Sequence, residues 1–179
     1  MPSAYNLLWG VNMKISRTII DIITVSLLGT LLHFTYELSG KNFVVGIFSA
    51  VNESVWEHLK LLFWPLFLVS FVEYFLLYSQ KNNFWLSRLL SLLIGVITIL
   101  TLHYTITGIV GKNIGIGNII IYYIAVITAF IADRIFMKNL KPKSKIISSV
   151  SFLLFIGIAF VFFAFTQNPP TLAIFAPPN

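Results

Sequence analysis

The chain has 179 residues, of which 58% are hydrophobic and only 10% are charged, and it contains no cysteine. A soluble domain needs about 25% charged residues to cover its surface, so this composition indicates a protein whose solvent is lipid. The absence of cysteine excludes disulfides, thiolate metal ligands and a cysteine nucleophile. The net charge of +6 is typical of the basic loops of a membrane protein, and we do not expect nucleic-acid binding.

Five apolar runs reach about 20 residues, the length that a helix needs to cross a bilayer. They are Arg17–Leu38, Ser54–Tyr78, Trp85–Gly108, Gly117–Met137 and Ile146–Thr166. The apolar segment Asn42–Val51 is too short to cross, and we interpret it as an interfacial or re-entrant piece. No alternating pattern of a membrane β-barrel is evident. The sequence therefore predicts an all-α integral membrane bundle with five transmembrane spans, built as one domain over residues 1–179.

Basic residues are distributed unevenly over the loops that join these runs. Nine of the twelve lie before the first run, between the second and third, and between the fourth and fifth: Lys14, Arg17, Lys81, Arg88, Arg134, Lys138, Lys141, Lys143 and Lys145. Because basic residues mark cytoplasmic loops, the N-terminus is predicted on the cytoplasmic side of the cell membrane and the C-terminus on its outer side. The first run is too long for a typical cleavable signal peptide, and Met13 is a second candidate start.

The three histidines of the chain are predicted to lie at one depth in the membrane. His33 is near the end of the first span, His58 near the start of the second and His103 near the end of the third. At 1.5 Å per residue, each lies about 6–9 Å inside the outer end of its helix. Ionisable residues inside a membrane are costly, so their convergence predicts a functional site. Structural hydrogen bonds between helices and chance are the alternatives.

Two carboxylates accompany the histidines. Glu37 follows His33 by four residues, so the two side chains lie on the same helical face. Glu57 directly precedes His58. Histidine and glutamate are ligands of zinc and other divalent ions, and a carboxylate also orients an imidazole. The candidate metal ligands are His33, His58, His103 and Glu37. The candidate catalytic residues are His58, Glu57, His33, Glu37 and His103.

Part of the polar stretch at the start of the second span has a simpler interpretation. Ser54 followed by Glu57 is the pattern of a capping box, and Asn52 is an alternative cap. Glu53 and Ser54 are therefore expected mainly to start a helix, and Lys60 either to extend outward or to pair with Glu57. The chain has no G-x-S-x-G motif, so a serine hydrolase is not favoured.

A second set of charged residues is predicted at the cytoplasmic rim. Its three acidic residues are expected to pair with nearby arginines: Asp21, Glu73 and Asp133 with Arg17, Arg88 or Arg134. No ionisable residue connects this set to the histidines, and only scarce hydroxyls such as those of Ser26 and Thr98 lie between. A continuous polar pathway through the membrane is therefore not evident.

Two motifs resemble a known family of small bacterial multi-pass membrane proteins of unassigned function. They are HFTYELSG, at His33–Gly40, and VNESVWEHLKLLFWP, at Val51–Pro65, and YTITG, at Tyr104–Gly108, also fits. The resemblance covers most of the chain. It implies the same membrane architecture and supports the choice of residues, but it implies no reaction.

Three functions fit this pattern. The first, which we favour, is a membrane-embedded, metal-dependent hydrolase or lipid-modifying enzyme that acts on a lipid or a lipid-linked group. The second is a small transporter or a proton- or ion-linked carrier. The third is a non-catalytic scaffold or partner subunit. Membrane lipids are the expected partners, and no particular protein partner is indicated.

Overall fold

The computed structural model describes residues 4–112, 115–141 and 144–177, with side chains described from residue 16 onward. This part of the chain is helical and contains no strand. Its helices are α1 (Ala4–Leu38), α2 (Phe43–Phe48), α3 (Val55–Glu73), α4 (Phe84–Val110), α5 (Gly115–Asn139) and α6 (Lys145–Gln167). A π-helical turn, Tyr74–Tyr78, continues α3, and a 3-10 turn, Ala173–Phe175, follows α6. Lys143 and the side chain of Lys14, which the sequence assigns to the basic loops, lie outside the described part.

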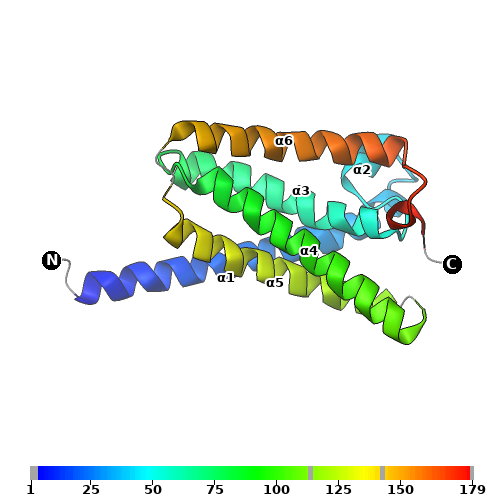
Figure 1. Ribbon diagram of the computed structural model, residues 1–179, viewed down its shortest axis with the longest axis horizontal. Helices are drawn as coiled ribbons and strands as arrows, with labels where there is room; N and C mark the ends of the chain where they lie inside the picture. The colour runs from blue at the N-terminus through cyan, green and yellow to red at the C-terminus, as the bar shows by residue number, and fades with distance from the viewer. Residues whose placement is uncertain (1–3, 113–114, 142–143, 178–179) are drawn as a thin grey trace.

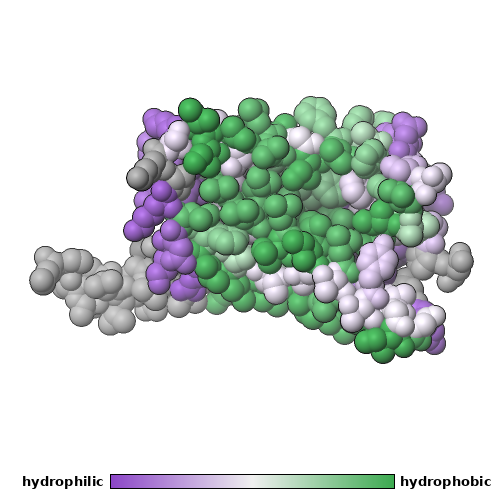
Figure 2. Space-filling model, viewed as in Figure 1, coloured by the Kyte–Doolittle hydropathy of each residue, from purple (hydrophilic) through white to green (hydrophobic). Residues whose placement is uncertain are grey.

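Five of these helices are long and apolar enough to cross a membrane, which confirms the predicted number of spans. The crossing segments are Ser16–Leu38, Val55–Tyr78, Phe84–Val110, Gly115–Asn139 and Lys145–Gln167. Figure 2 shows a hydrophobic belt across the middle of the visible face, with hydrophilic residues gathered toward both ends. The architecture is that of a multi-pass membrane protein.

Two elements refine the predicted boundaries. Helix α1 begins at Ala4 rather than at Arg17, because the hydropathy pattern marks where a helix enters lipid and not where the helix starts. The predicted interfacial or re-entrant segment contains α2, whose N-cap Asn42 accepts hydrogen bonds from the amides of Val44 and Val45. Helix α2 packs against α1, α3 and α6 at one end of the bundle.

The helices form an antiparallel bundle (Figure 1). Helix α4 runs beside α5 and also contacts α3 and α6, while α1 packs against α3 and α5. The turn of α2 and the 3-10 turn lie together at the end opposite the N-terminus. We call this the histidine end, because it carries His33, His58 and His103. We call the other the basic end, because it carries Arg17, Arg88 and Lys138.

Helices α1, α3 and α5 approach closely at Gly29. A Cβ atom there would lie 1.9 Å from the hydroxyl of Tyr122 and 2.6 Å from the carbonyl oxygen of Leu61. That carbonyl has no helical partner on α3, because Pro65 lacks the amide that would bond to it. The Tyr122 hydroxyl donates to the carbonyl of Val25 at 2.8 Å. Small residues are typical of such helix contacts in membranes.

The basic end contains a buried ionic cluster. Glu73 accepts a hydrogen bond from Arg17 Nε at 2.5 Å and another from Arg88 Nη2. Arg88 Nη1 also lies 3.6 Å from Asp133 Oδ2. The predicted pairing of these acids with arginines is therefore confirmed for Glu73 and Asp133. Asp21 is buried nearby and, like Arg88 and Asp133, lines a cavity at this end of the bundle.

Candidate metal centre

The loop before α3 is fixed by side-chain caps. Ser54 is the N-cap, and its hydroxyl accepts from the amide of Glu57 at 3.4 Å. The other half of the expected capping box is not formed, because Asn52 Oδ1 accepts from the Ser54 amide at 2.8 Å. The Glu57 carboxylate instead accepts from the amide of Val51 at 2.9 Å. Hydrogen bonds to the side chains of Asn52, Ser54 and Glu57 therefore fix residues 51–54 against the start of α3.

Glu57 and Lys60 form a buried ion pair behind this loop. The two charged groups lie 2.6 Å apart, and their side chains are 3% and 0% exposed. Lys60 Nζ also donates to the carbonyl of Gly46 at 2.8 Å and to the hydroxyl of Thr166 at 3.1 Å. Of the two predicted roles of Lys60, pairing with Glu57 is thus the one observed, and the lysine connects α3 with α2 and α6.

The anchored loop presents Glu53 to two histidines from different helices. Glu53 Oε1 lies 3.7 Å from His33 Nε2 on α1, and Glu53 Oε2 lies 3.6 Å from His58 Nε2 on α3. The two imidazole rings are 5.7 Å apart between centroids. Glu53 is 61% exposed, while the histidines are largely covered. One carboxylate therefore bridges two imidazoles at the surface of the bundle.

Hydrogen bonding prepares the His58 imidazole to accept rather than donate at Nε2. His58 Nδ1 lies 2.8 Å from the carbonyl oxygen of Ser54. A carbonyl only accepts, so Nδ1 carries the proton and the lone pair of the neutral ring is on Nε2, toward Glu53. His33 Nδ1 is buried, and no hydrogen-bond partner for it occurs among the described residues. A buried polar atom without a partner is uncommon and calls for a functional explanation.

The spacing of these three residues suits a metal ion. One ligand atom from each of His33, Glu53 and His58 can be chosen so that all lie within 4.8 Å of one another. Zinc binds nitrogen and oxygen ligands at about 2.0–2.2 Å in a tetrahedron, which places neighbouring ligand atoms about 3.4 Å apart. The nitrogen–oxygen distances from His58 to Glu53 Oε2 and from His33 to Glu53 Oε1, 3.6 and 3.7 Å, are within a few tenths of this value.

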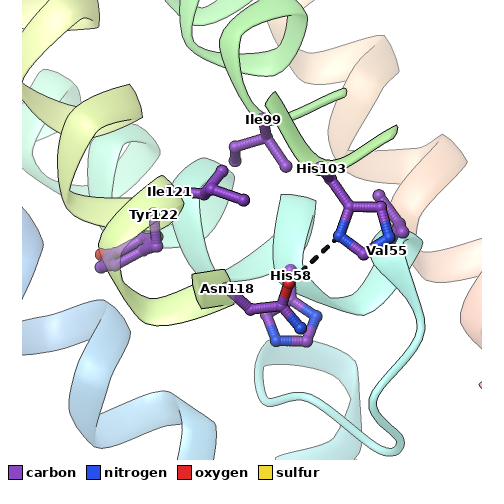
Figure 3. A pocket seen from close by; sticks show the side chains of 7 residues that line it. All are labelled: Val55, His58, Ile99, His103, Asn118, Ile121 and Tyr122. Atoms are coloured by element: carbon purple, nitrogen blue, oxygen red, sulfur yellow. Dashed lines mark hydrogen bonds between the residues drawn. The ribbon is translucent and has the colours of Figure 1, made fainter. Parts of the chain in front are cut away.

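His103 lies near His58, at a small pocket that both residues line. Its Nδ1 is 3.1 Å from Asn118 Oδ1, a bond that joins α4 to α5 (Figure 3). His58, His103 and Asn118 line one small pocket, whose apolar wall includes Val55 and Ile99. As at His58, a donating Nδ1 leaves the lone pair on Nε2. His103 therefore faces the same small pocket as His58 but does not belong to the three-residue ligand set.

The two predicted carboxylates lie elsewhere. Glu37 is exposed and 3.7 Å from Lys41, on the next turn of the chain. Glu57 is occupied by Lys60 and the Val51 amide, so it acts on the loop that carries Glu53. The structure thus brings together His33 and His58 as expected, and supplies Glu53 in place of Glu37 as the adjoining carboxylate.

Sequence comparison identifies a family for this chain. No curated protein and no solved structure matches it at a significant level. Residues 10–178 match the model of a family described as a family of unknown function, DUF6512. Because the match covers nearly the whole chain, the chain belongs to the DUF6512 family.

Proposed function

We propose that His33, Glu53 and His58 bind one divalent ion, with zinc as the first choice, and that the resulting centre hydrolyses a lipid or a lipid-linked group at the membrane surface. The observation that carries the proposal is the convergence of three ligand atoms from α1, the α2–α3 loop and α3 within 4.8 Å. Two histidines and one glutamate are a ligand set of catalytic zinc sites, which keep the fourth position open.

The residues around the set support a catalytic use. A bound divalent ion supplies Lewis acidity toward water and toward a carbonyl or phosphoryl oxygen. The Ser54 carbonyl holds His58 in the tautomer that a ligand needs. His103, held by Asn118 across the small pocket, is the candidate to take or give a proton. Glu57 is a positioning residue, because it holds the loop and not the ion.

The surroundings of the centre favour a lipid substrate. His33 is followed by Phe34, whose ring lies 5.0 Å away and which is 54% exposed on the outside of α1. Leu31 is 61% exposed nearby on the same helix. An acyl chain on this apolar surface would place a polar head group beside the exposed Glu53, at the border between lipid and water.

The transport alternative gains less support. Among the described residues, the buried ionisable side chains fall into two groups, one at each end of the bundle. Lys60 and Glu73 are the members of these two groups that lie nearest each other on α3, and they are separated by about 20 Å at 1.5 Å per residue. No buried charge lies between them in the described part of the chain. A scaffold role remains a prediction from the sequence.

Metal binding tests the proposal directly. The protein is purified in detergent, loaded with zinc and analysed for bound metal per chain and for affinity by competition with a chelator. One tightly bound ion per chain is expected in the wild type. His33→Ala, His58→Ala and Glu53→Gln should each lose more than the roughly 10–100-fold that loss of an outer-shell partner causes. Circular dichroism establishes that each variant is folded.

Glu37→Gln separates two possible ligand sets. If Glu53 is the carboxylate ligand, this variant retains the ion, whereas the set expected from sequence alone requires its loss. His103→Ala should keep the ion but lose metal-dependent hydrolysis of lipid esters or phosphoesters. A wild-type protein that binds no ion in stoichiometric amount would refute the metal centre, and an ion bound without any hydrolysis would leave a structural metal site.

A further inference from the structure

A large polar cavity lies at the basic end, remote from the candidate metal centre. Its volume is about 680 Å³, and it is bounded by α1, the α3–α4 connection and the last turns of α5. Six cationic side chains line it: Arg17, Lys81, Arg88, Arg134, Lys138 and Lys141. Only two carboxylates line it, those of Asp21 and Asp133. The excess of positive charge indicates a site for an anion.

Arg88 lines this cavity but, unlike a typical basic residue of a surface loop, its side chain is buried. Its side chain is 2% exposed. The guanidinium carbon lies 5.2 Å from the ring centres of both Phe84 and Phe130, so two aromatic faces hold the group. Its Nη2 donates to Glu73 and its Nη1 lies 3.6 Å from Asp133 Oδ2, whereas its Nε makes no hydrogen bond within the described part of the chain.

The edges of the cavity are also organised. Asn83 Nδ2 donates to the carbonyls of Met137 and Leu140, at 2.8 and 3.1 Å, and so fixes the end of α5 against the start of α4. This bond sets the position from which Lys138 and Lys141 extend to the rim. Both lysines are exposed, so they are free to approach a ligand that enters from the membrane surface or from water.

We propose that this cavity binds a phosphate-bearing anion, either the head group of an anionic lipid or a free phosphate compound. A phosphate offers several strong acceptor oxygens, which suit arginine and lysine donors. Topology alone requires exposed basic residues in loops. It requires neither a cavity of this size nor an arginine held between two aromatic rings in the cavity wall. The site is independent of the metal centre, because it shares no residue with it.

Binding by purified protein in detergent tests this site. Phosphatidylglycerol and phosphatidylcholine are titrated at constant salt and bound lipid is counted by native mass spectrometry, while inorganic phosphate and glycerol 3-phosphate are titrated by calorimetry. The test variant is Lys138→Gln with Lys141→Gln, on the exposed rim. The matched control is Lys145→Gln, which removes a lysine of the same end that does not line the cavity.

Each lysine near a phosphate contributes about 1 kcal/mol, so the double variant should bind the anion about 10- to 30-fold more weakly. The Lys145→Gln control should bind as the wild type does. If only phosphatidylglycerol binds, the ligand is a lipid head group. If the soluble phosphates bind, the ligand is a free phosphate compound. Either result supports the site. Equal loss in control and test variants, or no preference for any phosphate anion over phosphatidylcholine, would overturn it.

Discussion

Replacing Lys60 with methionine removes a cation from the interior of the bundle and leaves its partner in place. In the wild type, Lys60 Nζ is 2.6 Å from Glu57 Oε2 and donates to Gly46 and Thr166 as well. In Lys60→Met, the Glu57 carboxylate keeps only the Val51 amide at 2.9 Å. The substitution therefore leaves the buried Glu57 carboxylate without its counter-ion.

The expected loss follows from the burial of both groups. Breaking a buried ion pair by removing one partner destabilises a protein by about 3–5 kcal/mol, because the remaining charge is not compensated. For a chain of this size, 1 kcal/mol corresponds to about 2–4 °C in Tm. Lys60→Met should therefore lower the apparent Tm by about 6–20 °C. Adding Glu57→Gln should restore most of it, since a neutral pair needs no counter-charge and the glutamine oxygen still accepts from Val51.

The assay is thermal unfolding in detergent, followed by intrinsic fluorescence and by circular dichroism, for the two single variants and the double variant. The double variant should also retain metal binding, because the loop that carries Glu53 remains anchored. The reasoning is refuted if Lys60→Met unfolds at the wild-type temperature. It is also refuted if the double variant is as unstable as the sum of the two single variants, since the two groups would then be uncoupled.

Two further predictions concern packing and topology. Gly29→Ala should lower the Tm measured by thermal unfolding by several degrees, because its Cβ would clash with Tyr122. The control Gly157→Ala has open space around the new Cβ, so its Tm should stay within about 2 °C of the wild type. The native chain lacks cysteine, so single cysteines report sidedness: in intact cells, an impermeant maleimide should label Asn168→Cys but not Gln80→Cys. The reverse pattern would invert the predicted orientation.

The spans could be predicted from the sequence because lipid imposes a length and a composition on every crossing helix. The same physics does not determine how far α1 extends outside the lipid: the span predicted from Arg17 agrees with the crossing segment Ser16–Leu38, but the helix itself starts at Ala4. It also does not determine which apolar helices touch. The close approach at Gly29 depends on the carbonyl of Leu61 and the hydroxyl of Tyr122, two groups that are distant in the chain.

At the candidate site, helical periodicity predicted the positions of residues that lie on helices but not those of residues in the loop before α3. The depth of His33 and His58 was predicted because each lies on a regular helix, and the two imidazoles do meet. Glu53 was expected mainly to help start a helix. Helix α3 starts only at Val55, so Glu53 belongs to a loop and its direction is set by the caps around it. Asn52 and Ser54 were the available signals, and they indicated a helix start and not a ligand.

The adjacent residues Glu57 and His58 show how one short stretch serves both stability and chemistry. Successive residues on a helix point about 100° apart. Glu57 therefore faces Lys60 and the loop inside the bundle, while His58 faces Glu53 and, beyond it, His33. The buried ion pair holds the loop, and the loop holds the exposed carboxylate against the two imidazoles. The polar groups at the start of α3 thus support one another: the buried ion pair of Glu57 and Lys60 holds the loop that places the Glu53 carboxylate beside the two imidazoles.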